Sequence, residues 1–225
     1  GPPLSDYVAP QVGKYIIYRT DSTVFTQFQS VVEVHSYHEK QIVDAQLTDN
    51  LGRTTFRVLR YLRDTLNTQP WAPAGTFLIT PTEKTVEVTE DNLRVLKLNF
   101  PILETTIWKG NTHLPESPYD GLHKFSNDDE MEDWEFTYSS VDGSQKFNGQ
   151  LVEDIITVTQ VDESTNIPVT PSVGYASINF GEEKYAKGIG LVYQNFIMWE
   201  YQLNPGSPPP TYQGFGIKRA MIDHN

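Results

Sequence analysis

The sequence predicts an all-β protein, mainly antiparallel, whose curved sheets form an open barrel or a sandwich with little helix. Two observations predict this class. Apolar and polar side chains alternate over residues 96–100 and 134–138, and a period of two is typical of half-buried strands. Aromatic residues make up 12% of the 225 residues, and aromatic side chains are enriched in strands. The length suits one β domain or two packed lobes.

Ten or more strands are expected along the chain. Apolar and β-branched residues are dense at positions 14–20, 24–37, 42–47, 76–80, 85–89, 152–161, 175–180, 188–201 and 214–222. Residues 54–66 have apolar spacing that fits a strand or a helix, and a strand over 54–62 is preferred.

Turn-forming residues separate several of these segments. Asp49-Asn50-Leu51-Gly52 and Val141-Asp142-Gly143-Ser144 place Asn, Asp and Gly where tight turns need them, so both are expected to be hairpin turns. Residues 204–210 contain four prolines, which have no backbone N–H, so a loop between the last two strands is expected there.

A change of composition near Phe100 and Pro101 suggests a boundary. We expect an N-terminal β lobe over residues 1–100 and a C-terminal β lobe over residues 101–225. Within the second lobe, residues 111–133 combine Pro115, Pro118 and Gly121 with acidic residues, and they are expected to form a long irregular excursion.

The net charge of −12 argues against a nucleic-acid partner, because an acidic surface repels phosphate groups. Arg53, Arg57, Arg60 and Arg63 are the nearest to a basic stripe. No aromatic stacking platform accompanies them, so they are expected to lie on a solvated face of a strand or short helix.

The residues that carry most enzyme chemistry are missing or poorly placed. There is no cysteine and no Gly-x-Ser-x-Gly motif. His35 and His38 are three apart, which on a strand directs them to opposite faces, while His113, His123 and the acidic run 128–133 are expected to be solvated. We expect no catalytic residue, no metal ligand and no cofactor.

Three short motifs resemble those of a known group of proteins. They are Asn99-Phe100-Pro101-Ile102, Trp108-Lys109-Gly110-Asn111 and the segment at 185–193, Tyr-Ala-Lys-Gly-Ile-Gly-Leu-Val-Tyr. Together they resemble a pattern in uncharacterised lipoproteins of Bacteroidetes-type bacteria, a family without an assigned activity. The resemblance implies a protein of the cell envelope, in the periplasm or at the outer membrane. It also implies that the chain contacts the membrane only through a lipidated cysteine ahead of Pro2.

Gly188 and Gly190 in the third motif are two residues apart. On a strand they share one face, so another backbone or a large ring is expected to approach them closely. A phosphate-binding loop is not expected, because a strand and not a helix follows the glycines.

Aromatic residues are the remaining positive feature. Some of them are expected to line a cleft for a lipophilic or glycan ligand, although core packing is the alternative for each ring. The candidate ligand-binding residues are Trp108, Trp134, Tyr193, Trp199 and Tyr201.

The function that the sequence favours is therefore a non-catalytic binding or interaction module, whose partner is an envelope ligand or protein. Two alternatives stay open. One is an envelope glycan hydrolase that uses a pair of carboxylates, and the other is a structural accessory subunit of an outer-membrane complex.

Overall fold

The computed structural model describes residues 1–123, 127–128, 130–170, 172–203 and 210–225. It contains twelve strands, and in the described residues the helix is limited to two single-turn 3₁₀ helices. In chain order the elements are η1 (Leu4–Asp6), β1 (Tyr15–Thr26), β2 (Val31–Thr48), β3 (Thr54–Arg63), β4 (Ala72–Pro81), β5 (Thr85–Glu90), β6 (Leu93–Asn99), β7 (Ile107–Lys109), η2 (Met131–Asp133), β8 (Glu135–Phe147), β9 (Gln150–Thr165), β10 (Tyr175–Ala186), β11 (Gly190–Gln202) and β12 (Thr211–His224).

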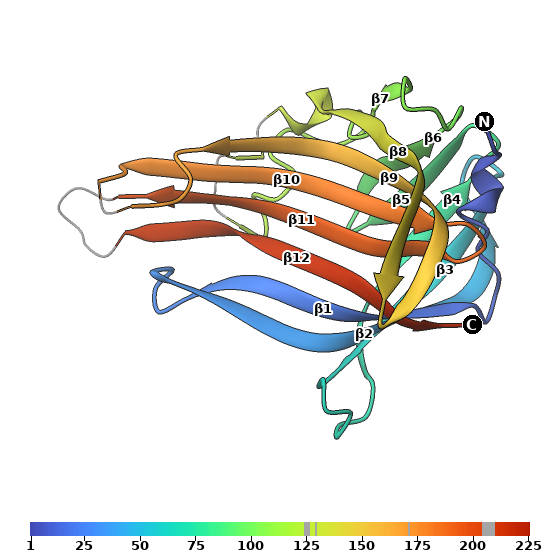
Figure 1. Cartoon of the computed structure of the whole chain (residues 1–225), viewed down its shortest axis with the longest axis horizontal. Coiled ribbons are helices and arrows are strands. Elements are labelled where there is room, and N and C mark those ends of the chain that lie inside the picture. The colour runs from blue at the N-terminus through green and yellow to red at the C-terminus, as the bar shows by residue number, and fades with distance from the viewer. Residues whose placement is uncertain (124–126, 129, 171, 204–209) are drawn as a thin grey trace.

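All twelve strands belong to one sheet, with the order β6-β5-β4-β3-β2-β1-β12-β11-β10-β9-β8-β7. Each pairing is antiparallel, and the pairing of β1 with β12 joins the first half of the chain to the second. The sheet curls into a nearly closed barrel (Figure 1). The predicted all-β class with antiparallel strands is confirmed.

The barrel has a seam between the edge strands β6 and β7. Two hydrogen bonds cross this seam: the backbone N–H of Leu96 donates to the carbonyl of Gly110, and the indole Nε1 of Trp108 donates to the carbonyl of Leu96, each at 2.8 Å. The expected boundary near Phe100 falls between β6 and β7, within this one sheet. The division into two lobes stays a prediction.

The structure corrects the expected strand at 24–37, which is two strands joined by a hairpin turn. Gln27, Phe28 and Gln29 adopt left-handed backbone angles, with φ of 48°, 59° and 66°, and Ser30 closes the turn through a hydrogen bond to the carbonyl of Gln27. None of these residues is Gly, Pro, Asn or Asp, so the sequence lacked the usual turn signal.

The turn expected at 141–144 is also wrong, because β8 continues through it. The register between β8 and β9 shifts on both sides of Gly143, so Asp142-Gly143 lies in an irregularity of the strand. The hairpin turn falls instead at Asn148 and Gly149, whose φ values of 47° and 82° suit the left-handed turn that joins adjacent strands.

Two other predictions of local structure are confirmed. The turn at Asp49–Gly52 is confirmed: Asp49 Oδ1 accepts the backbone N–H of Leu51 and of Arg53, and Gly52 has a φ of 77°. The strand reading of residues 54–62 is confirmed by β3. The loop expected at 204–210 lies outside the described residues except for Pro210.

The glycine pair is not arranged as expected. Gly188 lies in the turn before β11 with a φ of 74°, and a Cβ added there would meet no atom within 4 Å. Gly190 has a φ of 117°, and an added Cβ would be 3.5 Å from Ile16 Cδ1. Gly188 is therefore needed for its backbone angle and not for a close approach.

Two segments without long strands pack against the inner core. In the N-terminal segment (residues 4–14), Leu4, Tyr7 and Val8 are buried in the largest hydrophobic cluster. This segment crosses one end of the barrel, at the right in Figure 1, and is tied to the β10–β11 turn by the bond from Gly188 N–H to the Asp6 carbonyl. In the excursion before β8, Leu114 and Met131 pack against Met198 of β11.

Candidate functional site

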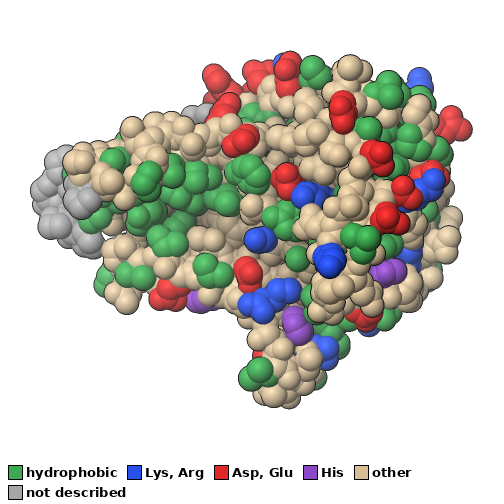
Figure 2. Space-filling view, viewed as in Figure 1, with side chains coloured by type: hydrophobic (Ala, Val, Ile, Leu, Met, Phe, Trp, Pro, Cys, Tyr) green, Lys and Arg blue, Asp and Glu red, His purple; other side chains and the backbone are tan. Residues whose placement is uncertain are grey.

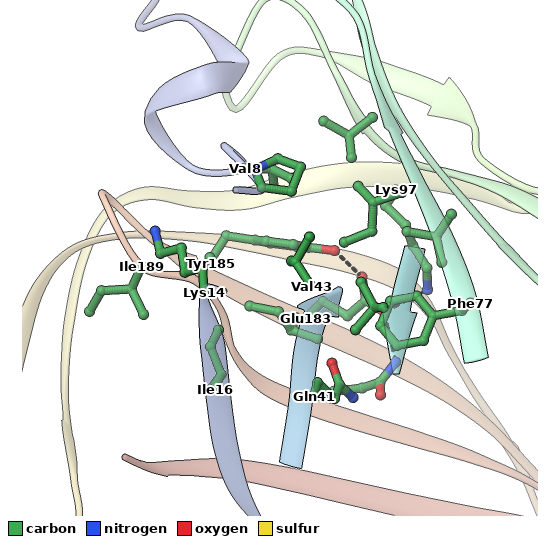
Figure 3. Close-up of a pocket in the computed structure, with 18 of the residues that line it drawn as sticks. Val8, Lys14, Ile16, Gln41, Val43, Phe77, Lys97, Glu183, Tyr185 and Ile189 are labelled. Carbon is green, nitrogen blue, oxygen red and sulfur yellow. Dashed lines mark hydrogen bonds and ion pairs between the residues drawn. The ribbon is translucent and has the colours of Figure 1, made fainter. Parts of the chain in front are cut away.

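A cavity of about 170 Å³ lies under the N-terminal segment. Figure 3 draws much of its lining, with Val8, Val43 and Phe77 around the hydrogen-bonded pair of Tyr185 and Glu183. It is lined by residues of β2 to β6 as well as β1 and β10 to β12, so it lies between the two halves of the sheet.

One side of the cavity is apolar. We call it the apolar wall, and it comprises Val43, Val58, Phe77, Ile79, Val86 and Val88 of β2 to β5. Val43, Val58 and Phe77 form a buried cluster of their own, with Ile79 and Val88 packed against it, whereas Val86 belongs to the largest cluster. Val8 of the N-terminal segment adds a further apolar surface at the same cavity.

Ionised groups that contact one another adjoin the apolar wall, and the guanidinium of Arg60 lies 5.2 Å from the ring centroid of Phe77. All of them line the cavity except Glu39, which lies next to the lining residues Arg60 and Arg219. Glu39 on β2 is 1% exposed and is held by two arginines. Arg219 Nε lies 3.0 Å from each carboxylate oxygen of Glu39, and Arg60 Nε lies 2.9 Å from Oε1. Arg60 also donates to Glu90, and Gln41 donates to Glu39 at 2.6 Å. Strands from both halves of the chain are thereby connected.

A second carboxylate, Glu183 on β10, extends this arrangement. It is also 1% exposed and accepts hydrogen bonds from Lys97 Nζ at 2.6 Å, Tyr185 Oη at 2.6 Å and Gln194 Nε2 at 2.8 Å. Gln194 in turn accepts a hydrogen bond from Arg219, which joins the two carboxylates. We call the whole set the polar layer, and its ionised members are Glu39, Glu90, Glu183, Arg60, Lys97 and Arg219.

The polar layer contains three carboxylates and three cationic groups, so its formal charge is zero. Burial alone would raise the pKa of Glu39, but the charges of Arg219 and Arg60 outweigh it and hold that pKa below its usual value of 4.5. Burial, followed by the negative charge of Glu183, raises the pKa of Tyr185 well above its usual value. Glu39 is thus ionised and Tyr185 is neutral at pH 7.

The cavity also contains hydrogen-bond donors that are not fully used. Among the described residues that line it there is no His, Ser or Cys to serve as a nucleophile or its base. Lys97 donates one hydrogen bond, to Glu183, whereas an ammonium group has three N–H donors. The cavity can therefore offer donors to a ligand while its apolar wall receives an apolar group.

The five aromatic residues expected to bind a ligand lie in different places. None of them lines this cavity. Trp108 is buried at the seam, with its ring centroid 4.9 Å from that of Tyr138. Trp134 packs on Phe196 at a centroid distance of 6.4 Å and also lines a second cavity.

The other three candidates are on β11. Trp199 and the buried Tyr201 both contact the ring of Tyr212 on β12, at centroid distances of 5.6 and 5.1 Å. Tyr193 lies apart from them, and Lys184 Nζ is 5.2 Å from its ring centroid. The structure brings Trp199 and Tyr201 together around Tyr212, but it does not gather all five rings. Their role in ligand binding stays a prediction.

The arginine stripe matches the expected solvated face only in part, since the side chain of Arg57 is 45% exposed. Arg60 points into the barrel with its side chain 14% exposed, because it shares the inward face of β3 with Phe56 and Val58. Arg53 pairs with Asp49 and Glu87. The period of two along β3 was the signal that could have placed Arg60 inside.

Glu39, Lys97, Glu183 and Arg219 were missed by the sequence reasoning. Arg219 and Glu39 are 180 positions apart, and no local motif marks them as partners. Only the pairing of β1 with both β2 and β12 brings them together.

Comparisons with known proteins leave the family open. No family model matches the chain, and no curated protein matches it. One solved structure, from Bacteroides fragilis and described as a "putative exported protein with YmcC-like fold", covers 96% of this chain and 99% of its own, with a TM-score of 0.36 and 10% identity. A likeness this weak carries no argument about function.

Within the described part of the chain, no helix has the length and apolarity that a membrane span requires. The same residues contain no group of three or more His, Asp or Glu side chains that could hold a metal ion.

Proposed function

We propose that this protein is a binding module whose barrel takes up a small amphiphilic molecule, with the apolar part of the ligand on the apolar wall and its head group on the polar layer. The observation that carries the proposal is the juxtaposition of these two surfaces in one cavity. Valine and phenylalanine side chains lie beside ionised groups in the lining of one cavity of about 170 Å³. Ligand pockets commonly combine a mainly apolar lining with a few fixed polar groups.

The size of the cavity limits the ligand. An apolar cavity of about 150 Å³ takes up benzene. A small ring or a short acyl chain therefore fits the cavity as it stands. A longer chain would extend past Val8, Ala9 and Pro10 of the N-terminal segment, which line the cavity together with Lys14.

The donors of the polar layer set the chemistry of the head group. Lys97 has N–H donors beyond the one used on Glu183, so an acceptor-bearing head can be held without removing an existing bond. A carboxylate head gains a charge-assisted hydrogen bond there. We therefore expect a medium-chain carboxylate such as octanoate to be a suitable probe.

The test is calorimetric titration with octanoate, with the melting temperature measured in parallel. A ligand that binds only the native state stabilises it by about 2.7 kcal/mol at 100 times its Kd, which is a rise of roughly 5–10 °C for a chain of this length. Lys97→Met removes the donor and is expected to weaken binding about tenfold. Val58→Phe fills the cavity and is expected to abolish binding.

The matched control is Val32→Phe, because Val32 is 47% exposed and does not line the cavity. This variant is expected to bind octanoate as the unmodified protein does. Equal binding by the Val58→Phe and Val32→Phe variants, or no saturable binding of octanoate or its longer homologues by the unmodified protein, would contradict the proposal.

We also propose an envelope location and a lipid anchor as the only membrane contact. The support is the resemblance of the motifs at 99–102, 108–111 and 185–193 to envelope lipoproteins. Mass spectrometry of the protein isolated from its native cells tests this: a diacylated N-terminal cysteine is expected, and an unmodified N-terminus would contradict it.

A further inference from the structure

A second cavity, of about 530 Å³, is chemically unlike the first. It lies where η2, β8, β9 and β10 meet, and we call it the acidic groove. Its lining comprises Glu130, Asp133, Trp134, Glu135, Thr159, Gln160, Val161, Asp162, Glu163 and Asn179. Acidic side chains also gather along the upper edge of the molecule in Figure 2, the edge formed by β8 and β9 in Figure 1.

The carboxylates of the acidic groove are largely uncompensated. Asp133 pairs with Lys109 Nζ at 2.6 Å. Among the described residues, no side-chain hydrogen bond or ion pair joins the carboxylates of the other four, Glu130, Glu135, Asp162 and Glu163, to a partner. Lys109 lies opposite Glu135 on β7 and partly offsets its charge. The groove therefore holds an excess of negative charge at pH 7 and favours a ligand with positive charge.

A buried amide at the groove independently indicates a ligand. Gln160 is 3% exposed, yet its Nε2 has no hydrogen-bond partner in the described part of the chain. A buried donor left without an acceptor costs about 1–3 kcal/mol. A cation alone would not relieve this cost, because an ammonium group has no acceptor. The ligand must therefore also carry an acceptor such as a hydroxyl group.

The backbone places Gln160 at this position. The register between β9 and β10 shifts after the pair Gly181 and Val161, so Gln160 has no partner on β10 and is the extra residue of a β-bulge. Gly181 makes room for it: a Cβ at Gly181 would be 2.7 Å from Gln160 Oε1 and 3.0 Å from Gln160 Cβ. The bulge and the glycine together accommodate Gln160 in the lining of the groove.

Trp134 supplies the third element of the groove. Its ring is half-buried and is fixed against Phe196. The negative face of an indole ring attracts the C–H edges of a sugar ring as well as ammonium groups. The groove thus combines an aromatic surface, an unpartnered N–H donor and unpaired carboxylates.

We infer that the acidic groove binds a short oligosaccharide that carries free amino groups. The hydroxyl groups accept from Gln160 and donate to carboxylates, the ammonium groups offset the charge of Glu135, Asp162 and Glu163, and one sugar ring packs on Trp134. This site is separate from the 170 Å³ cavity proposed to take up an amphiphile, which we call the amphiphile cavity, since the two linings share no residue.

The test is calorimetric titration of the full chain with a glucosamine trisaccharide. Saturable binding is expected, about tenfold tighter than that of the fully N-acetylated trisaccharide, and it is expected to weaken in about 0.5 M salt. Spermidine tests for a cation site without sugar recognition, and it is expected to bind less tightly than the trisaccharide.

Two variants separate the contributions of the carboxylates and of Trp134 to oligosaccharide binding. Asp162→Asn combined with Glu163→Gln changes two exposed side chains without affecting the core, and it is expected to weaken binding about tenfold. Trp134→Phe is expected to weaken binding by a similar factor, with Trp199→Phe as its matched control. If the Trp134→Phe variant fails to fold, the variant that combines Asp162→Asn with Glu163→Gln still tests the inference.

Several outcomes would overturn the inference: no saturable binding of the glucosamine trisaccharide, equal binding of its N-acetylated form, binding of spermidine at least as tight, or binding unchanged in the Asp162→Asn, Glu163→Gln variant. Octanoate binding reports on the other cavity, so failure of one proposal is distinguishable from failure of the other.

Discussion

Replacement of Glu39 by Gln tests the central structural feature of the barrel interior. The substitution keeps the size of the side chain and removes its charge. Glu39 is 1% exposed, and its two cationic partners, Arg60 and Arg219, have side chains 14% and 10% exposed. The variant therefore leaves two buried guanidinium groups without their shared carboxylate.

The expected loss of stability follows from these contacts. Removing one partner of a buried ion pair costs about 3–5 kcal/mol. Arg60 keeps Glu90 and Arg219 keeps Gln194, so the lower end is expected, about 3 kcal/mol. For a chain of this length the melting temperature should fall by roughly 6–12 °C.

The assay is urea unfolding and thermal melting of the Glu39→Gln variant, with Glu90→Gln as the matched control. Glu90 shares the partner Arg60, but its side chain is 38% exposed, so its loss should cost at most about 1 kcal/mol. A loss below about 1 kcal/mol for Glu39→Gln, or equal losses for both variants, would refute the reasoning.

The pH dependence provides a second check on Glu39. Its pKa is lower in the folded protein than the usual value of 4.5. The ion pairs therefore stabilise the fold fully above about pH 4.5, and this contribution is lost as the pH falls through the lowered pKa. The difference in stability between the unmodified protein and Glu39→Gln should be constant from neutral pH down to this point and should narrow below it.

Two further substitutions test the backbone and the seam. Gly214→Ala is expected to lower the free energy of unfolding by about 2–4 kcal/mol, because the φ of Gly214 is 119° and a Cβ would collide with the Met198 carbonyl and lie 2.7 Å from Trp199 Cα. The control Gly52→Ala has open space and a φ of 77°, so it should cost about 1 kcal/mol. Equal losses for the two variants in urea unfolding would contradict the collision. Trp108→Phe removes the hydrogen bond from the indole N–H to the Leu96 carbonyl. It is expected to lower the free energy of unfolding by at least about 1–2 kcal/mol and to speed hydrogen exchange of the Leu96 amide. Unchanged stability and exchange would show that the seam does not depend on this bond.

The sequence was informative about the fold wherever the side-chain pattern is local. The alternation at residues 134–138 predicted a strand, and in β8 the alternate residues Phe136 and Tyr138 are buried against the core. The turn at 27–30 was missed because its left-handed backbone is carried by Gln and Phe, which seldom mark turns. The turn expected at Gly143 was wrong because Asp-Gly serves a strand irregularity there, and Asn148-Gly149 supplies the hairpin.

The candidate site was far less predictable. The apolar wall consists of ordinary strand residues, and the polar layer depends on contacts such as Arg219 with Glu39 and Lys97 with Glu183, which join strands distant in sequence. Aromatic density directed attention to β11, where Trp199 and Tyr201 pack on Tyr212. Buried ionised groups leave no local signature in a chain in which 20% of the residues are charged.

The most direct test of ligand uptake is to measure nuclear Overhauser effects between octanoate and methyl-labelled valines. The amphiphile cavity predicts contacts from the acyl chain to Val43, Val58 and Val88, and none to the exposed Val32 and Val34. Contacts confined to Val32 and Val34, with none to the three cavity valines, would contradict the account.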